Sequence, residues 1–204
     1  AHAAMPYNGV NAALHILNFV GACYGDKFAQ STYAMLKDWQ GKPLGIDIDG
    51  AYMGFLTMNT GIVNIENGSA SITIDIRYPN DADVDKIMKG FYDTANSLEY
   101  PLDITLCKDT KPLFVDPNSE LVTKLTNVYQ EYTKDTFTPN KTIGGGTYAK
   151  KFKNFVAFGP EFAHNEPDTD MFIGGCHQKD EAVKLTDLMT AAAIYVAAVE
   201  QLAK

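Results

Sequence analysis

Histidine is the scarcest residue type in this chain that can carry acid–base or metal chemistry. The four histidines are His2, His15, His164 and His177. Neutral imidazole is the commonest zinc ligand, and imidazole can also donate or accept a proton near neutral pH. A zinc site needs about three or four protein ligands, and spacing alone gathers no such set around His177. Spacing therefore favours loop positions for His164 and His177, and a flank or core position for His15. It leaves His2 either a frayed residue or a working one.

Arg77 is the most informative charged residue. It ends the segment "SITIDIR" in a chain with 17 basic and 25 acidic residues. A guanidinium at the end of a strand can bind a carboxylate through two parallel hydrogen bonds. The alternative is an ion pair with Asp75, two residues earlier on the same face of the strand. The sequence leaves these two interpretations equal.

The segment "IGGGTYAK" offers three consecutive glycines, Gly144 to Gly146. Successive backbone N–H groups in such a loop can converge on an anion or on a substrate carbonyl. The segment lacks the Lys-Ser/Thr pair of a nucleotide-binding loop, so nucleotide binding is not expected. Taken alone, the glycines are better explained as a tight turn between a strand and a helix, with glycine chosen for positive φ.

Composition excludes several classes of protein. The formal net charge of -8 argues against a nucleic-acid partner, because phosphate binding requires a basic surface. No apolar run approaches the roughly 18 residues of a membrane-spanning helix. The three cysteines are odd in number and widely spaced, which predicts free thiols and a cytoplasmic location.

An α+β layer is predicted for the first half of the chain. Apolar spacing predicts amphipathic helices from Asn8 onward, over 31–39, and after Asp83. Alternating residues on both sides of Asn67-Gly68 predict a hairpin with a type I′ turn. The segment "PLDITLC" predicts one further short strand.

An α/β layer is predicted for the second half, with a helix introduced by Asp116-Pro117, a strand over "NFVAFGPE" and a last helix from about Thr186. The buried face expected for that last helix consists of Leu188, Ala192, Tyr195, Val199 and Leu202. Overall, the fold class expected is α/β and α+β.

Five motifs, "AHAAMPYNGVNAA", "IDIRYP", "IGGGTY", "VAFGPE" and "HQKDE…LTDL", occur here in the order found in the co-catalytic zinc dipeptidases. The chain resembles that family, which includes aminoacylases and carnosinases, and is most similar to its bacterial PepV-type dipeptidases acting on Xaa-His and β-Ala-His. The resemblance implies an α/β catalytic domain with two zinc ions that hydrolyses small dipeptides with water activated by zinc and a glutamate. It also implies an inserted lid domain.

The resemblance implies a role for each matching residue. His2 would be the catalytic lid histidine that stabilises the oxyanion of the tetrahedral intermediate. Arg77 would bind the terminal carboxylate of the substrate, and His177 would be the last zinc ligand. Main-chain groups of four residues would line the substrate backbone: Gly144, Gly145, Gly146 and Thr147.

On this resemblance, residues 1–108 correspond to the later part of the lid domain and residues 109–204 to the final segment of the catalytic domain. The family's remaining zinc ligands and its general base lie in an N-terminal catalytic half, which we expect as the partner of this chain. We therefore expect a small peptide substrate, an incomplete zinc site, an inactive isolated chain and a loosely held His2. Homo-oligomerisation is compatible with this interpretation. The alternatives left open are a related aminoacylase or deacylase, and a non-catalytic lid or dimerisation module.

Overall fold

The computed structural model describes residues 2–100, 102–159, 162, 171–174 and 179–203. The chain divides into two compact units. The first consists of Ala1–Pro112 and Thr142–Gly145, and the second of Leu113–Lys141 and Gly146–Lys204. Each unit has its own hydrophobic core and is described by itself.

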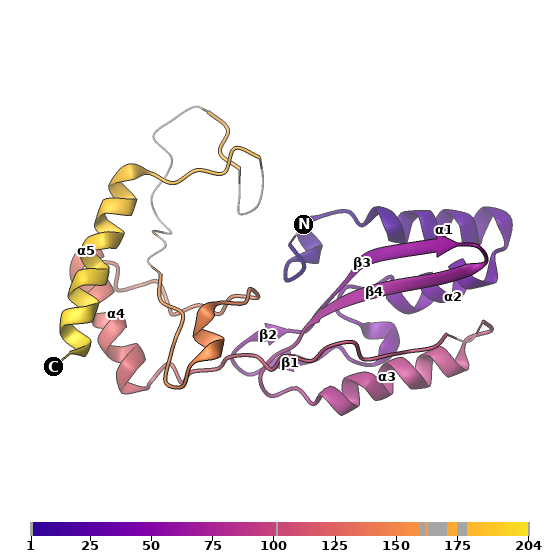
Figure 1. Cartoon of the computed structure of the whole chain (residues 1–204), viewed down its shortest axis with the longest axis horizontal. Helices are drawn as coiled ribbons and strands as arrows, with labels where there is room; N and C mark the ends of the chain where they lie inside the picture. Colours follow the sequence, from indigo (N-terminus) through magenta and orange to yellow (C-terminus); the bar gives the residue numbers. More distant parts are fainter. Residues whose placement is uncertain (1, 101, 160–161, 163–170, 175–178, 204) are drawn as a thin grey trace. The chain divides into compact units, whose positions relative to one another are not determined.

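Two packed helices open the first unit (Figure 1): α1 spans Ala12–Tyr24 and α2 spans Lys27–Leu36. Each helix begins at a side-chain cap, because Asn11 and Asp26 accept hydrogen bonds from backbone N–H groups of the first turn. Gly25 lies between the helices with a φ of 67°, a conformation that glycine adopts without strain. The helix expected from Asn8 therefore begins four residues later, after its cap.

A long antiparallel hairpin follows, with β3 over Thr57–Glu66 and β4 over Ser69–Arg77. Asn67 and Gly68 connect the strands with φ values of 50° and 78°. Positive φ at both central residues is the signature of a type I′ turn, so the predicted hairpin and its turn type are confirmed.

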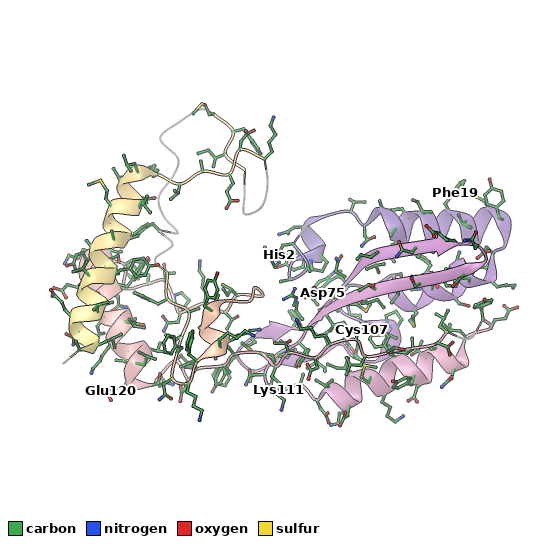
Figure 2. The ribbon with its side chains drawn as sticks, in the orientation of Figure 1. His2, Phe19, Asp75, Cys107, Lys111 and Glu120 are labelled. Carbon is green, nitrogen blue, oxygen red and sulfur yellow. The ribbon has the colours of Figure 1, made fainter. Side chains whose placement is uncertain are left out.

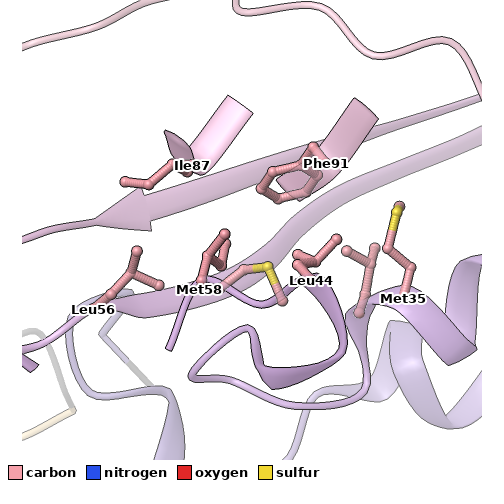
Figure 3. Packing of buried hydrophobic residues seen from close by; sticks show 8 residues of the cluster. Met35, Leu44, Leu56, Met58, Ile87 and Phe91 are labelled. Atoms are coloured by element: carbon pink, nitrogen blue, oxygen red, sulfur yellow. The ribbon is translucent and has the colours of Figure 1, made fainter. Parts of the chain in front are cut away.

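Helix α3 spans Val84–Ser97 and covers the apolar side of this hairpin, as its amphipathic spacing predicts. Asp83 caps it by accepting a hydrogen bond from the N–H of Asp85. Figure 3 shows Ile87 and Phe91 of α3 facing the other apolar side chains of the core. The buried residues of this core are Met35, Leu36, Leu44, Ile46, Leu56, Met58, Ile87 and Phe91.

Shorter elements complete the first unit. Two 3₁₀ turns, η1 and η2, cover Pro6–Asn8 and Lys42–Leu44. The two-residue strands β1 (Asp49–Gly50) and β2 (Gly54–Phe55) pair with each other in a second antiparallel sheet.

The strand predicted over "PLDITLC" is wrong for its described residues, 102–107, which pair with neither sheet. Leu102 and Ile104 still pack against the core of the first unit. Their alternation therefore reflects contact with that core, while the segment does not enter the hydrogen-bond ladder of β3 and β4.

In the second unit, α4 (Glu120–Thr133) packs against α5 (Leu185–Leu202). The predicted start of α4 at Asp116-Pro117 is wrong. Ser119 is the cap, because its hydroxyl accepts a hydrogen bond from the N–H of Val122.

The buried face of α5 also differs from the prediction. Ile194 and Ala198 are the buried residues of this helix, whereas Leu188 and Val199 are more than half exposed. The helix is apolar nearly all round, so its periodicity does not select one face. By length and composition it also meets the criterion for a membrane-spanning helix, contrary to expectation, although core helices of globular proteins pass the same test.

The fold class is confirmed as mixed α+β, with helices and, among the described residues, two small antiparallel sheets. The strand expected over "NFVAFGPE" is not formed in its described part, 154–159. Within the described part of the second unit, the β structure is one isolated parallel bridge between Gly174 and Glu181.

Candidate functional site

The end of β4 separates apolar from charged side chains. Ile74 and Ile76 contact the core, and the two-residue period of a strand places Asp75 and Arg77 on the opposite face. Arg77 donates from Nε to Oδ1 of Asp75 at 2.7 Å and from Nη2 to Oδ2 at 2.9 Å. The ion pair that the sequence left as an alternative is therefore formed.

The N-terminal segment is attached to this end of the hairpin. Thr57, at the start of β3, is the direct cross-strand partner of Arg77. Its hydroxyl donates a hydrogen bond to the carbonyl oxygen of Ala3 at 3.4 Å. His2 therefore lies at the same end of the hairpin as Asp75 and Arg77, as Figure 2 shows for His2 and Asp75.

Asn11 fixes the other end of the same segment. Its Oδ1 caps α1, while its Nδ2 donates to the carbonyl oxygen of Thr60 at 2.8 Å and to Oδ1 of Asn59 at 3.3 Å. A register shift between Thr60 and Ile62 interrupts the ladder at this point. One amide side chain thus joins the first helix to the β3 bulge, a role that the sequence pattern does not reveal.

His2 is half-buried and held by its neighbours, so the expectation of a loosely held residue is wrong. Its Nδ1 accepts a hydrogen bond from the N–H of Ala4 at 3.1 Å, and its carbonyl oxygen accepts one from Met5 at 2.8 Å. A nitrogen that accepts an N–H carries no proton, so the neutral imidazole holds its proton on Nε2. This tautomer presents a donor at the Nε2 end of the ring.

Gly144 meets both Arg77 and the N-terminal segment within the first unit. Nη1 of Arg77 donates to the carbonyl oxygen of Gly144 at 3.3 Å. A Cβ added to Gly144 would lie 2.0 Å from Cβ of Ala4, far inside van der Waals contact. Close approach therefore explains glycine at this position.

The expected explanation by positive φ does not apply to the glycine loop, since Gly144, Gly145 and Gly146 are not among the positive-φ glycines. A Cβ at Gly145 or Gly146 would meet no atom within 4 Å. The following element is the short 3₁₀ turn η3 (Tyr148–Lys151), with Thr147 as its cap residue. Gly146 and Thr147 belong to the second unit, so only the Thr142–Gly145 stretch takes part in the arrangement around Arg77.

Tyr78 adds a further contact that the sequence did not predict. Its hydroxyl donates a hydrogen bond to Oδ1 of Asp109, in the segment that leaves the first unit. Burial, followed by the hydrogen bond to Asp109 and the negative charge of that carboxylate, raises the pKa of Tyr78 to about 12. The phenol therefore remains a hydrogen-bond donor throughout the neutral range.

The metal chemistry implied by the resemblance is not assembled by the described residues. Among them, no group of three or more His, Cys, Asp or Glu side chains could hold a metal ion. His177 and His164 lie outside the described residues, as does Cys176. His15 is exposed on α1, and Cys23 is a free, exposed thiol.

The chemistry available at this end of the hairpin is hydrogen-bond donation to an anion. Arg77 supplies a guanidinium that donates to the carbonyl oxygen of Gly144, and His2 supplies an imidazole that is hydrogen-bonded to the N–H of Ala4. The arrangement suits binding of a carboxylate and stabilisation of negative charge that develops on an oxygen atom.

Comparison with known proteins gives the chain a family context. No family model matches it. It is 34% identical, over an aligned stretch of 208 positions that covers 98% of the chain, to a protein of Staphylococcus aureus (strain USA300) named as a putative dipeptidase. It is 34% identical, over an aligned stretch of 209 positions that covers the whole chain, to the putative dipeptidase YtjP of Bacillus subtilis (strain 168). The chain spans 42% of the length of these relatives. Along its whole length, the chain is thus similar to part of proteins named as dipeptidases.

Proposed function

We propose that this chain is the substrate-binding part of a dipeptidase, an enzyme that hydrolyses the peptide bond of small dipeptides. The carrying observation is the hydrogen-bonded arrangement of Arg77, Gly144 and the His2 segment at one end of the β3–β4 hairpin. The names of the relatives support the reaction class.

In this proposal, Arg77 binds the terminal carboxylate of the dipeptide. A guanidinium matches a carboxylate in charge and in the geometry of two parallel hydrogen bonds. The Arg77 side chain is 38% exposed, which leaves it accessible to a ligand. The main chain of Gly144 and Gly145 would line the substrate backbone.

His2 is proposed to stabilise the oxyanion that forms when water attacks the peptide carbonyl. A fixed N–H donor aimed at developing charge stabilises the transition state more than the ground state. The hydrogen bond from the N–H of Ala4 to Nδ1 supports this role, since it leaves the ring proton on Nε2.

We further propose that residues 1–108 act as a lid and residues 109–204 as part of a catalytic domain, in a cytoplasmic metalloenzyme containing zinc. His177 would supply one zinc ligand. The described residues do not fit a complete metal site, so the other ligands and the base that activates water would come from the rest of the enzyme.

The proposal is tested by assaying two proteins for dipeptide hydrolysis with zinc present. One is the 204-residue chain, and the other is the protein extended to the length of its relatives. We expect turnover only from the extended protein. Ordinary enzymatic turnover by the 204-residue chain would contradict the assignment of the other metal ligands and the base to the rest of the enzyme. No turnover by the extended protein on any dipeptide would overturn the proposed function.

The substrate class is tested with a panel of Xaa-His and β-Ala dipeptides against N-acyl amino acids. Both classes end in a carboxylate that Arg77 could bind, so the panel isolates the group on the other side of the scissile bond. We expect higher kcat/KM on the dipeptides. Preference for the N-acyl amino acids would assign the chain to an aminoacylase or deacylase.

A further inference from the structure

Arg77 has more hydrogen-bond donors than its partners use. A guanidinium carries five N–H groups: one on Nε and two on each terminal nitrogen. Asp75 takes the N–H of Nε and one on Nη2, and the carbonyl of Gly144 takes one on Nη1. Among the described residues, Arg77 makes no further hydrogen bond. Two N–H groups therefore remain, one on each terminal nitrogen.

Two N–H groups on neighbouring nitrogens are the number that one carboxylate takes in a bidentate pair. Asp75 occupies the side of the guanidinium that contains Nε, and it does so through both carboxylate oxygens. This pairing fixes the orientation of the guanidinium plane at the end of the Arg77 side chain. The residue that neutralises Arg77 is thus also the residue that orients its unused donors.

We propose that Asp75 is a positioning residue, which holds Arg77 side-on so that its terminal N–H groups stay arranged for a substrate carboxylate. This inference rests on the proposed function of Arg77. Asp75 itself does not contact the substrate. An arginine side chain carries large rotamer entropy, and a partner that restricts it beforehand reduces the ordering cost of binding.

The competing interpretation is that Asp75 merely offsets the charge of Arg77. The two interpretations predict opposite results for Asp75→Asn. Loss of a negative charge close to the binding site should strengthen carboxylate binding if charge alone matters. Loss of a bidentate partner should weaken it if orientation matters, because an amide has one oxygen in place of two and cannot accept the two parallel hydrogen bonds from Nε and Nη2.

The test is an NMR titration of the full 204-residue chain with glycylglycine, and with glycylglycinamide, which lacks the carboxylate. In the unmodified chain, we expect the Arg77 side-chain N–H signals to respond to glycylglycine and not to the amide. In Asp75→Asn, we expect glycylglycine to bind about two- to tenfold more weakly, the loss expected when one side chain must be ordered on binding. Faster solvent exchange of the Arg77 Nε–H should accompany this loss.

Asp85→Asn is the matched control, because Asp85 is an exposed carboxylate of the same unit that lies in the first turn of α3. It removes the same charge and should leave the affinity unchanged. Unchanged or tighter binding of glycylglycine to Asp75→Asn would overturn the positioning role. A response of Arg77 to both ligands, or to neither, would overturn the assignment of Arg77 to the carboxylate.

A kinetic measurement on the extended enzyme separates this inference from the proposed function. Asp75→Asn should raise KM for a dipeptide by the same two- to tenfold factor with little change in kcat. When Arg77 is already replaced by Met, Asp75→Asn should cause no further rise in KM, since the two substitutions remove the same interaction. Equal losses of kcat and kcat/KM would contradict the positioning role, whereas an inactive unmodified enzyme would contradict the dipeptidase proposal while leaving the NMR result valid.

Discussion

Arg77 illustrates how two competing interpretations of one residue can both apply. The sequence allowed either an ion pair with Asp75 or a site for a carboxylate. The ion pair is formed, yet it uses only two of the five guanidinium N–H groups. A structural ion pair at this position therefore does not compete with a ligand for the same donors. The ion pair can instead orient the arginine for ligand binding.

His2 is the residue on which the proposed chemistry can be tested most directly. In the extended enzyme, His2→Ala should lower kcat by about 100- to 1,000-fold, the usual cost of removing one oxyanion donor. KM should change much less, because the donor acts mainly in the transition state. Steady-state kinetics of the unmodified enzyme and the variant at saturating metal measure this. A rise in KM with unchanged kcat would instead assign His2 to ground-state binding.

The hydroxyl of Tyr78 gives a prediction for alkaline stability. Its pKa is raised to about 12 from an ordinary value of 10.0, first by burial and then by Asp109. Below pH 10, the phenol is protonated in both the folded and the unfolded chain, and its contribution to the free energy of unfolding is complete. Between pH 10 and 12, the unfolded chain loses the proton first, so that contribution is lost. Urea unfolding of the chain against Tyr78→Phe should show a difference in free energy of unfolding that shrinks across this window. A difference that stays constant with pH would contradict the assignment.

At the scale of elements, the close approach of Gly144 to Ala4 should be essential to the site. Gly144→Ala would place a Cβ 2.0 Å from that of Ala4, so the loop or the N-terminal segment must shift. We expect the amide signals of Ala4 and the side-chain signals of Arg77 to move in NMR spectra, with loss of the hydrogen bond to Gly144.

Gly145→Ala is the control for this prediction, since its Cβ would meet no atom within 4 Å. A second control is the double variant Ala4→Gly with Gly144→Ala, which removes the opposing methyl group and should restore the original spectrum around Arg77. Equal spectral changes in Gly144→Ala and Gly145→Ala would show that the contact is unimportant.

Elements whose signals are local were predictable from the sequence. The Asn67-Gly68 turn has only one two-residue hairpin geometry that suits its positive φ values, and the Asp83 cap marks the start of α3. Elements that depend on distant partners were not. The segment 102–107 alternates like a strand yet pairs with neither sheet, and α5 is too evenly apolar for its period to select the face around Ile194.

Across the whole molecule, the same distinction between local signals and distant contacts applies to the candidate site. The residue types of the site can be found in the sequence, but the hydrogen bonds that join them cannot. Motif resemblance selected His2, Arg77 and Gly144 from the sequence. It could not predict that Asn11 joins the first helix to the β3 bulge, because that contact spans 49 residues. The sequence therefore selected the candidate groups for the proposed chemistry, and the long-range hydrogen bonds determine how they are held.

The two units should unfold as separate cooperative bodies, because each has its own buried core. Leu56 and Ile194 are both fully buried, one in each core. Leu56→Ala should destabilise the first unit by about 2–5 kcal/mol, the usual cost of such a cavity, and Ile194→Ala should do the same to the second. Hydrogen exchange at α3 and at α4 reports the two units independently. Each variant should accelerate exchange in its own unit only, so that each serves as the control for the other. Acceleration in both units by either variant would mean that the chain unfolds as one cooperative body.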